Sequence, residues 1–396
     1  MKITLLGAGH IGSTIARMLQ NSGDYEVLVV DRDAKSLAAI ETPGIETRVA
    51  DSSDATALHA VLEARDAVIN ALPYHMAIPA AQAAKQARVH YFDLTEDVQA
   101  TKSIKQLAAG SSTAFMPQCG LAPGFIGIAA HALCKRFDEV HDVKMRVGAL
   151  PEFPTNALKY NLTWSVDGLI NEYSHPCEAI RAGELRDIQP LEGLEHFSLD
   201  GVEYEAFNTS GGLGTLCETL AGKVRNLDYK SVRYPGHCSL MKFLLEDLAL
   251  GTQQEQLKEI LRSAVPTTMQ DLVLVFVTVS GLRQGKLVQE AFSRKIFASR
   301  AHGKPVSAIQ ITTAAGICTA LDLFRAKLLP QSGFISQERI NLDDFLNNRY
   351  GRAYNQGMLP TQDHGAGAWL KQLGDKAFDI GNHPHEPSDH ALARLG

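Results

Sequence analysis

Short apolar runs alternate with amphipathic stretches along the first 125 residues. Such alternation is typical of a parallel sheet whose two faces are covered by helices. The apolar runs predict six strands, at 1–6, 26–30, 47–50, 67–72, 89–94 and 114–117. The stretches between them predict helices, among them 13–19, 55–64 and 79–87. Because parallel strands are joined by right-handed crossovers, we predict a doubly wound α/β sheet that binds ligands at the carboxyl ends of its strands.

The pattern changes after about residue 125 to one that fits a mixed α+β domain. A predicted helix, 125–136, precedes alternating apolar and polar residues at 140–148, as in a half-buried antiparallel strand. Further strand signals lie at 160–164, 230–234, 272–279 and 287–297, the last two joined by a turn that holds Gly281 and Gly285. A long apolar helix at 308–329 is expected to pack back on the first domain.

This pattern predicts two domains and a tail. The doubly wound domain takes residues 1–125 together with about 305–350, and an inserted α+β domain takes 126–304. Residues 361–396 are rich in Gly, His, Pro and Asp and are expected to form a loosely held tail. The tail histidines could bind a metal, but a solvated tail is the simpler interpretation and we predict no metal site; they are His364, His383, His385 and His390.

A glycine motif follows the first predicted strand at once and opens the first predicted helix. It reads Gly7-Ala8-Gly9-His10-Ile11-Gly12. Gly7 permits a tight turn, Gly9 lets backbone N–H groups approach a pyrophosphate, and Gly12 lets the helix pack close to the strand. Strand, glycine turn and helix in this order predict a Rossmann dinucleotide-binding domain, with a glycine-rich turn that holds no ligand as the alternative.

The acidic residue that this motif requires ends the second strand. Asp31 lies 19 positions after Gly12 and can accept both ribose hydroxyls of NAD. Arg32 beside it could attract the 2′-phosphate of NADP, but direct contact with the ribose favours NAD. Other residues expected around the cofactor follow the ends of the predicted strands: Asp51, Ala71, Leu72, Pro73, Leu94, Gly120 and Leu121.

Composition narrows the class of protein. Among 396 residues, 45% are hydrophobic and 21% charged, and 38 basic against 44 acidic side chains give a net charge of −6. This balance argues against nucleic acid or an anionic membrane as the main partner. No apolar run approaches the ~20 residues of a membrane span, and the strand that starts at Lys2 leaves no room for a signal peptide. The six cysteines form no C-x-x-C pair, so we expect free thiols and a cytoplasmic protein.

Several blocks together resemble the saccharopine dehydrogenase family, most closely its lysine 6-dehydrogenase members. Besides the glycine motif, the blocks are Asn70-Ala71-Leu72-Pro73-Tyr74, Tyr91-Phe92-Asp93-Leu94, Cys119-Gly120-Leu121-Ala122-Pro123-Gly124, Phe207-Asn208-Thr209-Ser210-Gly211-Gly212 and Lys230-Ser231-Val232-Arg233-Tyr234-Pro235-Gly236-His237. The resemblance implies a Rossmann domain, an inserted catalytic and oligomerisation domain, and hydride transfer from a C–N carbon to a nicotinamide. The saccharopine branch carries an acidic residue where this chain has Ala122, which argues for free lysine as the substrate.

Candidate catalytic residues follow the fourth and fifth strands. Oxidation of a primary amine requires its neutral form, so the site needs a base beside the amine. Asp93 and His75 are placed by the topology near the nicotinamide, and either could accept a proton or orient water. Tyr74 could wall the ring or donate a hydrogen bond. Asp93 and His75 could instead cap a neighbouring helix or turn. Cys119 is expected to be a small semi-buried residue, with a place in the site as the alternative.

Candidate substrate-binding residues lie in the inserted domain. Arg233 can hold the α-carboxylate of the substrate with two parallel hydrogen bonds, and His237 is a second candidate base. The run Thr209, Ser210, Gly211 and Gly212 could form a small anion-binding nest, or only a tight turn. Tyr160 and Trp164 are expected in the core or an interface, with contact to the aliphatic stem of lysine as the alternative.

The leading hypothesis from the sequence is an NAD-dependent lysine 6-dehydrogenase. It oxidises the side-chain amine to an imine, whose hydrolysis gives ammonia and an aldehyde that cyclises. A saccharopine dehydrogenase that forms glutamate is the second hypothesis, and a non-catalytic regulator that binds NAD(H) is the third. The long predicted sheet of the inserted domain favours at least a homodimer, since such faces are usually covered.

Overall fold

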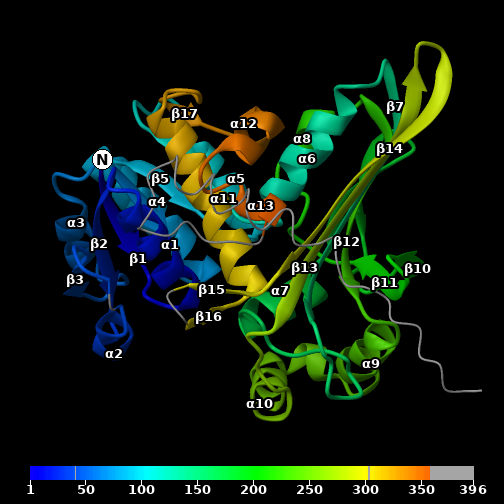
Figure 1. Cartoon of the computed structure of the whole chain (residues 1–396), viewed down its shortest axis with the longest axis horizontal. Helices are drawn as coiled ribbons and strands as arrows, with labels where there is room; N and C mark the ends of the chain where they lie inside the picture. Colours follow the sequence, from blue (N-terminus) through cyan, green and yellow to red (C-terminus); the bar gives the residue numbers. More distant parts are fainter. Residues whose placement is uncertain (41, 302–303, 357–396) are drawn as a thin grey trace, which may run out of the picture. The chain divides into compact units, whose positions relative to one another are not determined.

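A seven-stranded parallel sheet forms the first part of the fold, drawn mainly in blue in Figure 1. Its order is β17-β6-β5-β4-β1-β2-β3, and every pairing in it is parallel. The strands are β1 (Lys2–Leu6), β2 (Glu26–Asp31), β3 (Glu46–Val49), β4 (Ala67–Asn70), β5 (His90–Asp93), β6 (Ala114–Met116) and β17 (Gly333–Phe334). The chain builds outward from β1 to β3 and then crosses back to β4. The predicted doubly wound sheet is therefore confirmed, with its topological switch point between β1 and β4.

Helices cover both faces of this sheet, which explains why its inner strands are apolar on both sides, whereas the edge strand β3 is exposed. The computed structural model describes residues 1–40, 42–301 and 304–356. Ile3 and Leu5 point to one face, in a cluster that includes residues of α1 and α11. Leu6 and Val68 point to the other face, with residues of α3, α4 and α5. The helices of this part are α1 (His10–Asn21), α2 (Ala34–Ala38), α3 (Ala55–Leu62), η1 (Tyr74–Met76), α4 (Ala77–Ala87) and α5 (Val98–Ala108).

A mixed eight-stranded sheet dominates the second part of the fold. Its main path is β10-β11-β12-β7-β13-β14, and β8 pairs with both β12 and β9. The strands are β7 (Glu139–Pro151), β8 (Cys177–Arg181), β9 (Glu184–Ile188), β10 (Glu195–Leu199), β11 (Val202–Asn208), β12 (Val224–Arg233), β13 (Asp271–Arg283) and β14 (Lys286–Phe297). The long strands β13 and β14 run side by side over their whole length (Figure 1).

Short helices connect these strands. They are α6 (Phe125–Cys134), α7 (Val166–Ser174), α8 (Leu216–Leu220), α9 (His237–Lys242), η2 (Phe243–Asp247), η3 (Leu250–Thr252) and α10 (Gln254–Ala264). Residues of α7, α9 and α10 share a separate apolar cluster that includes Leu169, Met241 and Leu257. A pair of short strands, β15 (Ser299–Ala301) and β16 (Lys304–Val306), leads to the next helix.

Two details of the predicted inserted domain are wrong. The strand expected at 160–164 is irregular apart from one bridge between Leu162 and Thr267. Gly281 lies inside β13 at an irregularity in the pairing with β7, so the hairpin turn falls at 284–285. Gly281 lets β13 pass close to the backbone of Glu139, where a β-carbon would collide.

The apolar helix α11 (Ala308–Arg325) packs against α1, as contacts between their residues show. Its first turn is fixed by Asp271 of β13, whose carboxylate accepts from the N–H groups of Ala308 at 2.5 Å and Ile309 at 3.1 Å. At its far end Asp322 accepts a hydrogen bond of 2.7 Å from the hydroxyl of Tyr25. The last described elements are η4 (Gln337–Arg339), α12 (Leu342–Asn347) and α13 (Ala353–Gln356). The domain boundaries stay a prediction, and the tail histidines lie outside the described residues.

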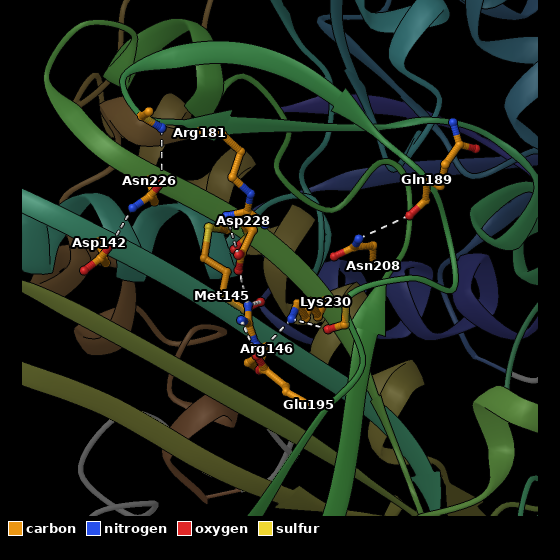
Figure 2. A network of polar contacts seen from close by, with 12 residues as sticks. Asp142, Met145, Arg146, Arg181, Gln189, Glu195, Asn208, Asn226, Asp228 and Lys230 are labelled. Atoms are coloured by element: carbon orange, nitrogen blue, oxygen red, sulfur yellow. Dashed lines mark hydrogen bonds and ion pairs between the residues drawn. The ribbon is translucent and has the colours of Figure 1, made fainter.

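A buried polar network ties the strands of the mixed sheet together (Figure 2). Arg146 of β7 is only 2% exposed and donates to Asp228 of β12 at 2.6 Å and to both carboxylate oxygens of Glu195 of β10. Lys230 donates to Glu195 at 2.9 Å, and Arg181 of β8 donates to Asp228 at 2.8 Å. Burial alone would raise the pKa of Asp228, but the two arginines outweigh it and hold this pKa below its usual range. The network therefore keeps four strands in register.

Replacement of Arg146 by methionine is expected to lower the free energy of unfolding by about 3–5 kcal/mol, because Asp228 and Glu195 lose the buried cation that they share and keep one partner each, Arg181 and Lys230. Urea denaturation followed by circular dichroism measures this loss. Arg181→Met is the matched control: its partly exposed guanidinium has one carboxylate partner, so we expect a loss of about 1 kcal/mol or less. Equal losses in the two variants would contradict the assignment of Arg146 as the centre of the network.

Candidate active site

A large cavity of about 820 Å³ brings together the carboxyl ends of the parallel strands and the inner face of the mixed sheet. The parallel-sheet part contributes the glycine turn and the loops after β4, β5 and β6. The mixed-sheet part contributes β7, β12, the loop before α7 and the start of α7. The N-terminal end of α11 closes one side with Ile309, Gln310 and Thr313. This is the crevice where an open α/β sheet is expected to bind its ligand.

The glycine turn fits a dinucleotide. A β-carbon on Gly12 would collide with the carbonyl oxygen of Gly7, so only glycine lets α1 start this close to β1. Gly9, by contrast, is exposed with open space around it, so the backbone there is accessible to a ligand. Asp31 accepts a hydrogen bond of 2.7 Å from the N–H of Ala8, which places its carboxylate beside the turn. The N-terminus of α1 and an acidic group therefore flank one site.

Most residues expected around the cofactor line the cavity. These are Gly9, His10, Ile11, Gly12, Ala71, Leu72, Pro73, Leu94, Gly120 and Leu121. Gly7 is buried at the start of the turn, and Asp31 and Arg32 lie beyond the lining at the end of β2. Asp51 is exposed, and its carboxylate accepts from the backbone and the hydroxyl of Ser53. These hydrogen bonds, and then the charge of Arg32, lower the pKa of Asp51.

Asp93 does not line the cavity, which corrects the expectation that it accepts a proton or orients water beside the nicotinamide. Its side chain is completely buried. It accepts from the hydroxyl of Tyr91 at 2.7 Å and from the N–H groups of Thr95 at 3.0 Å and Gln118 at 2.9 Å. Burial raises the pKa of Asp93 to about 6 despite these donors. Asp93 therefore joins the loops after β5 and β6 and supports the site from behind.

Besides Asp167, which forms ion pairs with Arg262 and Lys258, two carboxyl groups line the cavity, and the sequence analysis named neither. Glu96 follows Asp93 by three residues, on the loop between β5 and α5, and Glu172 lies on α7. Loss of hydration raises the pKa of Glu96 to about 7. Burial also raises the pKa of Glu172 to about 8, against the opposing effect of the Arg233 charge, and Glu96 adds to the rise. Both groups can therefore exchange protons near neutral pH, as a general base must.

Arg233 supplies a buried cation on the same cavity. It ends β12, is 2% exposed and lines the cavity together with Tyr229 and Ser231 of the same strand. Its Nε donates to the hydroxyl of Tyr173 at 3.0 Å and its Nη1 to the carbonyl of Val232 at 2.8 Å. No carboxylate in the described part of the chain forms an ion pair with it at hydrogen-bonding distance. A buried guanidinium without such a partner is suited to bind a carboxylate ligand.

The other residues expected to bind the substrate lie behind the cavity wall. His237 is fully buried, and burial and then the charge of Arg233 lower its pKa to about 3, which corrects the expectation of a base. The run Thr209–Gly212 leads from the end of β11 into a turn and does not line the cavity, which corrects the expected anion nest. A β-carbon on Gly212 would collide with the ring of Tyr229, and one on Gly211 would lie too close to the carbonyl of Glu96. These glycines permit close packing behind two lining residues.

Tyr74 and His75 differ in their position relative to the cavity. Tyr74 lines the cavity from η1, but His75 is exposed and does not line it. The two rings meet edge to face at 6.0 Å. A direct catalytic role for His75 therefore has no support from its position, whereas Tyr74 can wall the site.

An aromatic side chain from the loop before α7 also lines the cavity. Trp164 packs its ring over Gly168, where any β-carbon would collide with it, and its Nε1 donates to the hydroxyl of Tyr160 at 3.1 Å. Tyr160 is buried behind it and its ring lies 5.0 Å from the guanidinium carbon of Arg233. Trp164 can therefore contact the apolar part of a substrate, while Tyr160 supports Arg233.

The cysteines take no visible part in the site. All six are buried and free, and Cys119 contacts Gln337 behind the cavity loop. Among the described residues, no three His, Cys, Asp or Glu side chains gather as a metal site. Likewise, no helix within the described ranges has the length and apolar character needed to cross a membrane.

Two family descriptions match successive parts of the chain. "Saccharopine dehydrogenase NADP binding domain" matches residues 3–114, and "Saccharopine dehydrogenase C-terminal domain" matches residues 120–346. A curated relative, saccharopine dehydrogenase (NADP(+), L-glutamate-forming) of Saccharomyces cerevisiae, is 24% identical over 196 residues, which is 47% of this chain and 43% of the relative. The chain thus matches less than half the length of that relative.

Solved structures share the fold over most of the chain. The apo saccharopine dehydrogenase (L-Glu forming) from Saccharomyces cerevisiae superposes with a TM-score of 0.74 at 15% identity and covers 88% of this chain and 98% of its own. A homospermidine synthase from Legionella pneumophila in complex with NAD gives 0.62 at 13% identity, covering 89% of each chain. Because both domains of one family are matched in order along the sequence, the chain belongs to the saccharopine dehydrogenase family.

Proposed function

We propose that this protein is an NAD-dependent oxidoreductase that oxidises the side-chain amine of L-lysine. The observation that carries the proposal is the charge of the cavity. Its lining holds one buried cation without a carboxylate partner, Arg233, and two carboxyl groups with raised pKa, Glu96 and Glu172. Lysine carries one carboxylate and two amino groups, so its charges complement this set.

The remaining charged pair of the lining does not change this balance. Asp167 accepts from Arg262 at 3.0 Å and also forms an ion pair with Lys258 at 2.6 Å. Saccharopine, with three carboxylates, would meet only one unpaired arginine and two acidic groups. Desolvation of unpaired carboxylates is costly. The charge balance therefore favours lysine over saccharopine, the alternative substrate.

The roles of the lining residues follow from their positions. Arg233 holds the α-carboxylate, and Glu172, close to Arg233, holds the α-ammonium. Glu96, on the loop after β5, takes the proton from the side-chain ammonium so that the amine is neutral. A nicotinamide held by the glycine turn would supply the acceptor for the hydride that leaves the carbon carrying this amine. Water then hydrolyses the imine of the substrate to ammonia and the semialdehyde, which cyclises to piperideine-6-carboxylate.

The direct test incubates the purified protein with NAD and L-lysine. We expect reduced coenzyme and ammonia in equal amounts. Parallel reactions use ornithine, 1,5-diaminopentane, and saccharopine with glutamate measured as product. Turnover of saccharopine to glutamate with no reaction of lysine would replace the proposal by the saccharopine dehydrogenase alternative.

The preference for NAD is part of the proposal. The carboxylate of Asp31 stands beside the glycine turn and repels a 2′-phosphate. The nearby cation Arg32 lies within electrostatic range of Asp51, whose charge opposes its attraction for a phosphate. The glycine turn can bind the pyrophosphate of either coenzyme, so Asp31 determines the preference for NAD over NADP.

Asp31→Ser is expected to weaken NADH binding by about tenfold or more, since a hydrogen bond to a charged group contributes about 1.5–3 kcal/mol. NADPH binding should strengthen in the same variant. Fluorescence titration of both reduced coenzymes measures the two dissociation constants without any turnover. Asp33→Asn removes an equal charge two residues away, from an exposed carboxylate that caps α2, and should leave the ratio unchanged. A wild-type protein that binds NADPH more tightly than NADH would contradict the preference.

A further inference from the structure

Arg233 is held in place by a chain of hydrogen bonds that runs away from the cavity. Its Nε donates to the hydroxyl of Tyr173 at 3.0 Å, and this hydroxyl lies 3.1 Å from Nε2 of His237. The other ring nitrogen of His237, Nδ1, lies 3.0 Å from the carbonyl oxygen of Leu158. The cavity-facing cation is thus connected to the backbone of a different segment through two side chains.

The donor and the acceptor of each hydrogen bond in this series can be assigned. A carbonyl oxygen only accepts, so Nδ1 of His237 carries the hydrogen and Nε2 accepts. The hydroxyl of Tyr173 therefore donates to His237 and accepts from Arg233. All donors point outward from the guanidinium, which leaves Arg233 unable to rotate without breaking a hydrogen bond.

Packing restrains the same groups. The guanidinium carbon of Arg233 lies 5.0 Å from the ring of Tyr160 and 5.9 Å from that of Tyr173. His237 stacks on Phe207 at 6.2 Å with an angle of 9° between the rings. The turn that leads to His237 is also fixed, because buried Glu205 accepts from the N–H groups of Gly236 and Cys238.

We propose that Tyr173 and His237 are positioning residues that orient Arg233 for the α-carboxylate of the substrate. The proposal rests on the proposed function for the identity of the substrate, but not for the geometry. Neither side chain lines the cavity, so neither touches the reacting amine. Their loss should weaken carboxylate binding and leave the chemical step almost unchanged. His237 stays uncharged beside Arg233, since burial lowers its pKa to about 3, so its effect should not depend on pH between 6 and 9.

Tyr173→Phe tests this, because it removes the hydroxyl and keeps the ring. We expect KM for lysine to rise about tenfold or more, the usual effect of one hydrogen bond to a charged group, with kcat within about threefold. The kinetics of 1,5-diaminopentane, which has no carboxylate, should not change. Tyr234→Phe is the matched control, since its hydroxyl donates to Pro151 at 2.9 Å and not to Arg233. Its KM should match that of the wild type.

Two substitutions of His237 provide an independent check. His237→Gln keeps an acceptor for Tyr173 and should recover most of the affinity for lysine that His237→Leu loses. A Tyr173→Phe variant that changes both substrates equally, or changes kcat alone, overturns the proposal. If the wild type does not oxidise lysine, the proposed function fails. The geometry is then tested by calorimetry with L-norleucine: weaker binding to Tyr173→Phe than to Tyr234→Phe supports positioning, and equal binding overturns it.

Discussion

Replacement of Glu96 by glutamine is expected to lower kcat for lysine by about 10²–10⁴, the usual contribution of a general base. Glutamine has nearly the same shape but cannot accept the proton of the substrate ammonium. The loop after β5 is held by Asp93, through the backbone of Thr95, and should keep its conformation. Steady-state kinetics at saturating NAD and lysine measure the loss.

The pH profile separates this role from a simple loss of binding. A base acts in its ionised form, so kcat at saturating lysine, which does not report the binding role of Glu172, should fall as the pH drops below the Glu96 pKa of about 7. This acid limb of the pH profile should disappear in Glu96→Gln. Only the increase in rate that comes from deprotonation of the substrate amine itself should remain. Glu172→Gln is the matched control, with the same chemical change on the same cavity. It should raise KM for lysine and retain the limb. Loss of the limb in the control alone would assign the base to Glu172.

The parallel sheet could be predicted from the sequence because its inner strands are buried on both faces. Such strands give continuous apolar runs, and β1, β2 and β4 appeared within one or two residues of their bounds. Strands β9 and β10 gave no such signal, since their residues are mostly exposed or half-buried. Edge strands of this kind depend on pairing with distant segments, which a local pattern does not reveal.

The cavity lies at the end of the sheet where the sequence predicts a site, but the acidic side chains that line it differ from the predicted one. The end of β5 gave Asp93, whose side chain points to the buried loops, while the next acidic residue along the chain, Glu96, lines the cavity. That residue could have been found by extending the search along the loop. Glu172 could not, because it sits on a helix with no local motif and reaches Arg233 only through the tertiary fold.

Residue type alone also failed to separate support from contact. The Thr-Ser-Gly-Gly run predicts an anion nest and a close-packed turn equally well, and the position of the Tyr229 ring decides for the turn. His237 follows Arg233 by four residues, a spacing that fits a second ligand-binding group. The fold instead turns α9 behind the strand, so the histidine supports the arginine.

Arg233→Met is expected to lower kcat/KM for lysine by roughly 10²–10³. The variant removes the proposed partner of the substrate α-carboxylate, and loss of one partner of a buried charge pair costs about 2–5 kcal/mol. Methionine fills part of the space but offers no donor to the carboxylate. The loss should fall mainly on KM. It should spare 1,5-diaminopentane, so that the preference for lysine over the diamine collapses. Equal losses for both substrates would contradict a carboxylate-binding role, and thermal unfolding checks that the variant is folded.

Arg233→Lys distinguishes the effect of the positive charge from that of the guanidinium geometry. An ammonium keeps the charge but cannot supply two parallel donors, and it cannot donate to Tyr173 and to a ligand in the same fixed plane. If charge alone attracts the substrate, the lysine variant should recover nearly all of the affinity lost in Arg233→Met. If the oriented fork matters, as the hydrogen bonds through Tyr173 and His237 indicate, recovery should be small. The ratio of KM values for lysine in the two variants therefore separates a buried positive charge from a pre-organised carboxylate site.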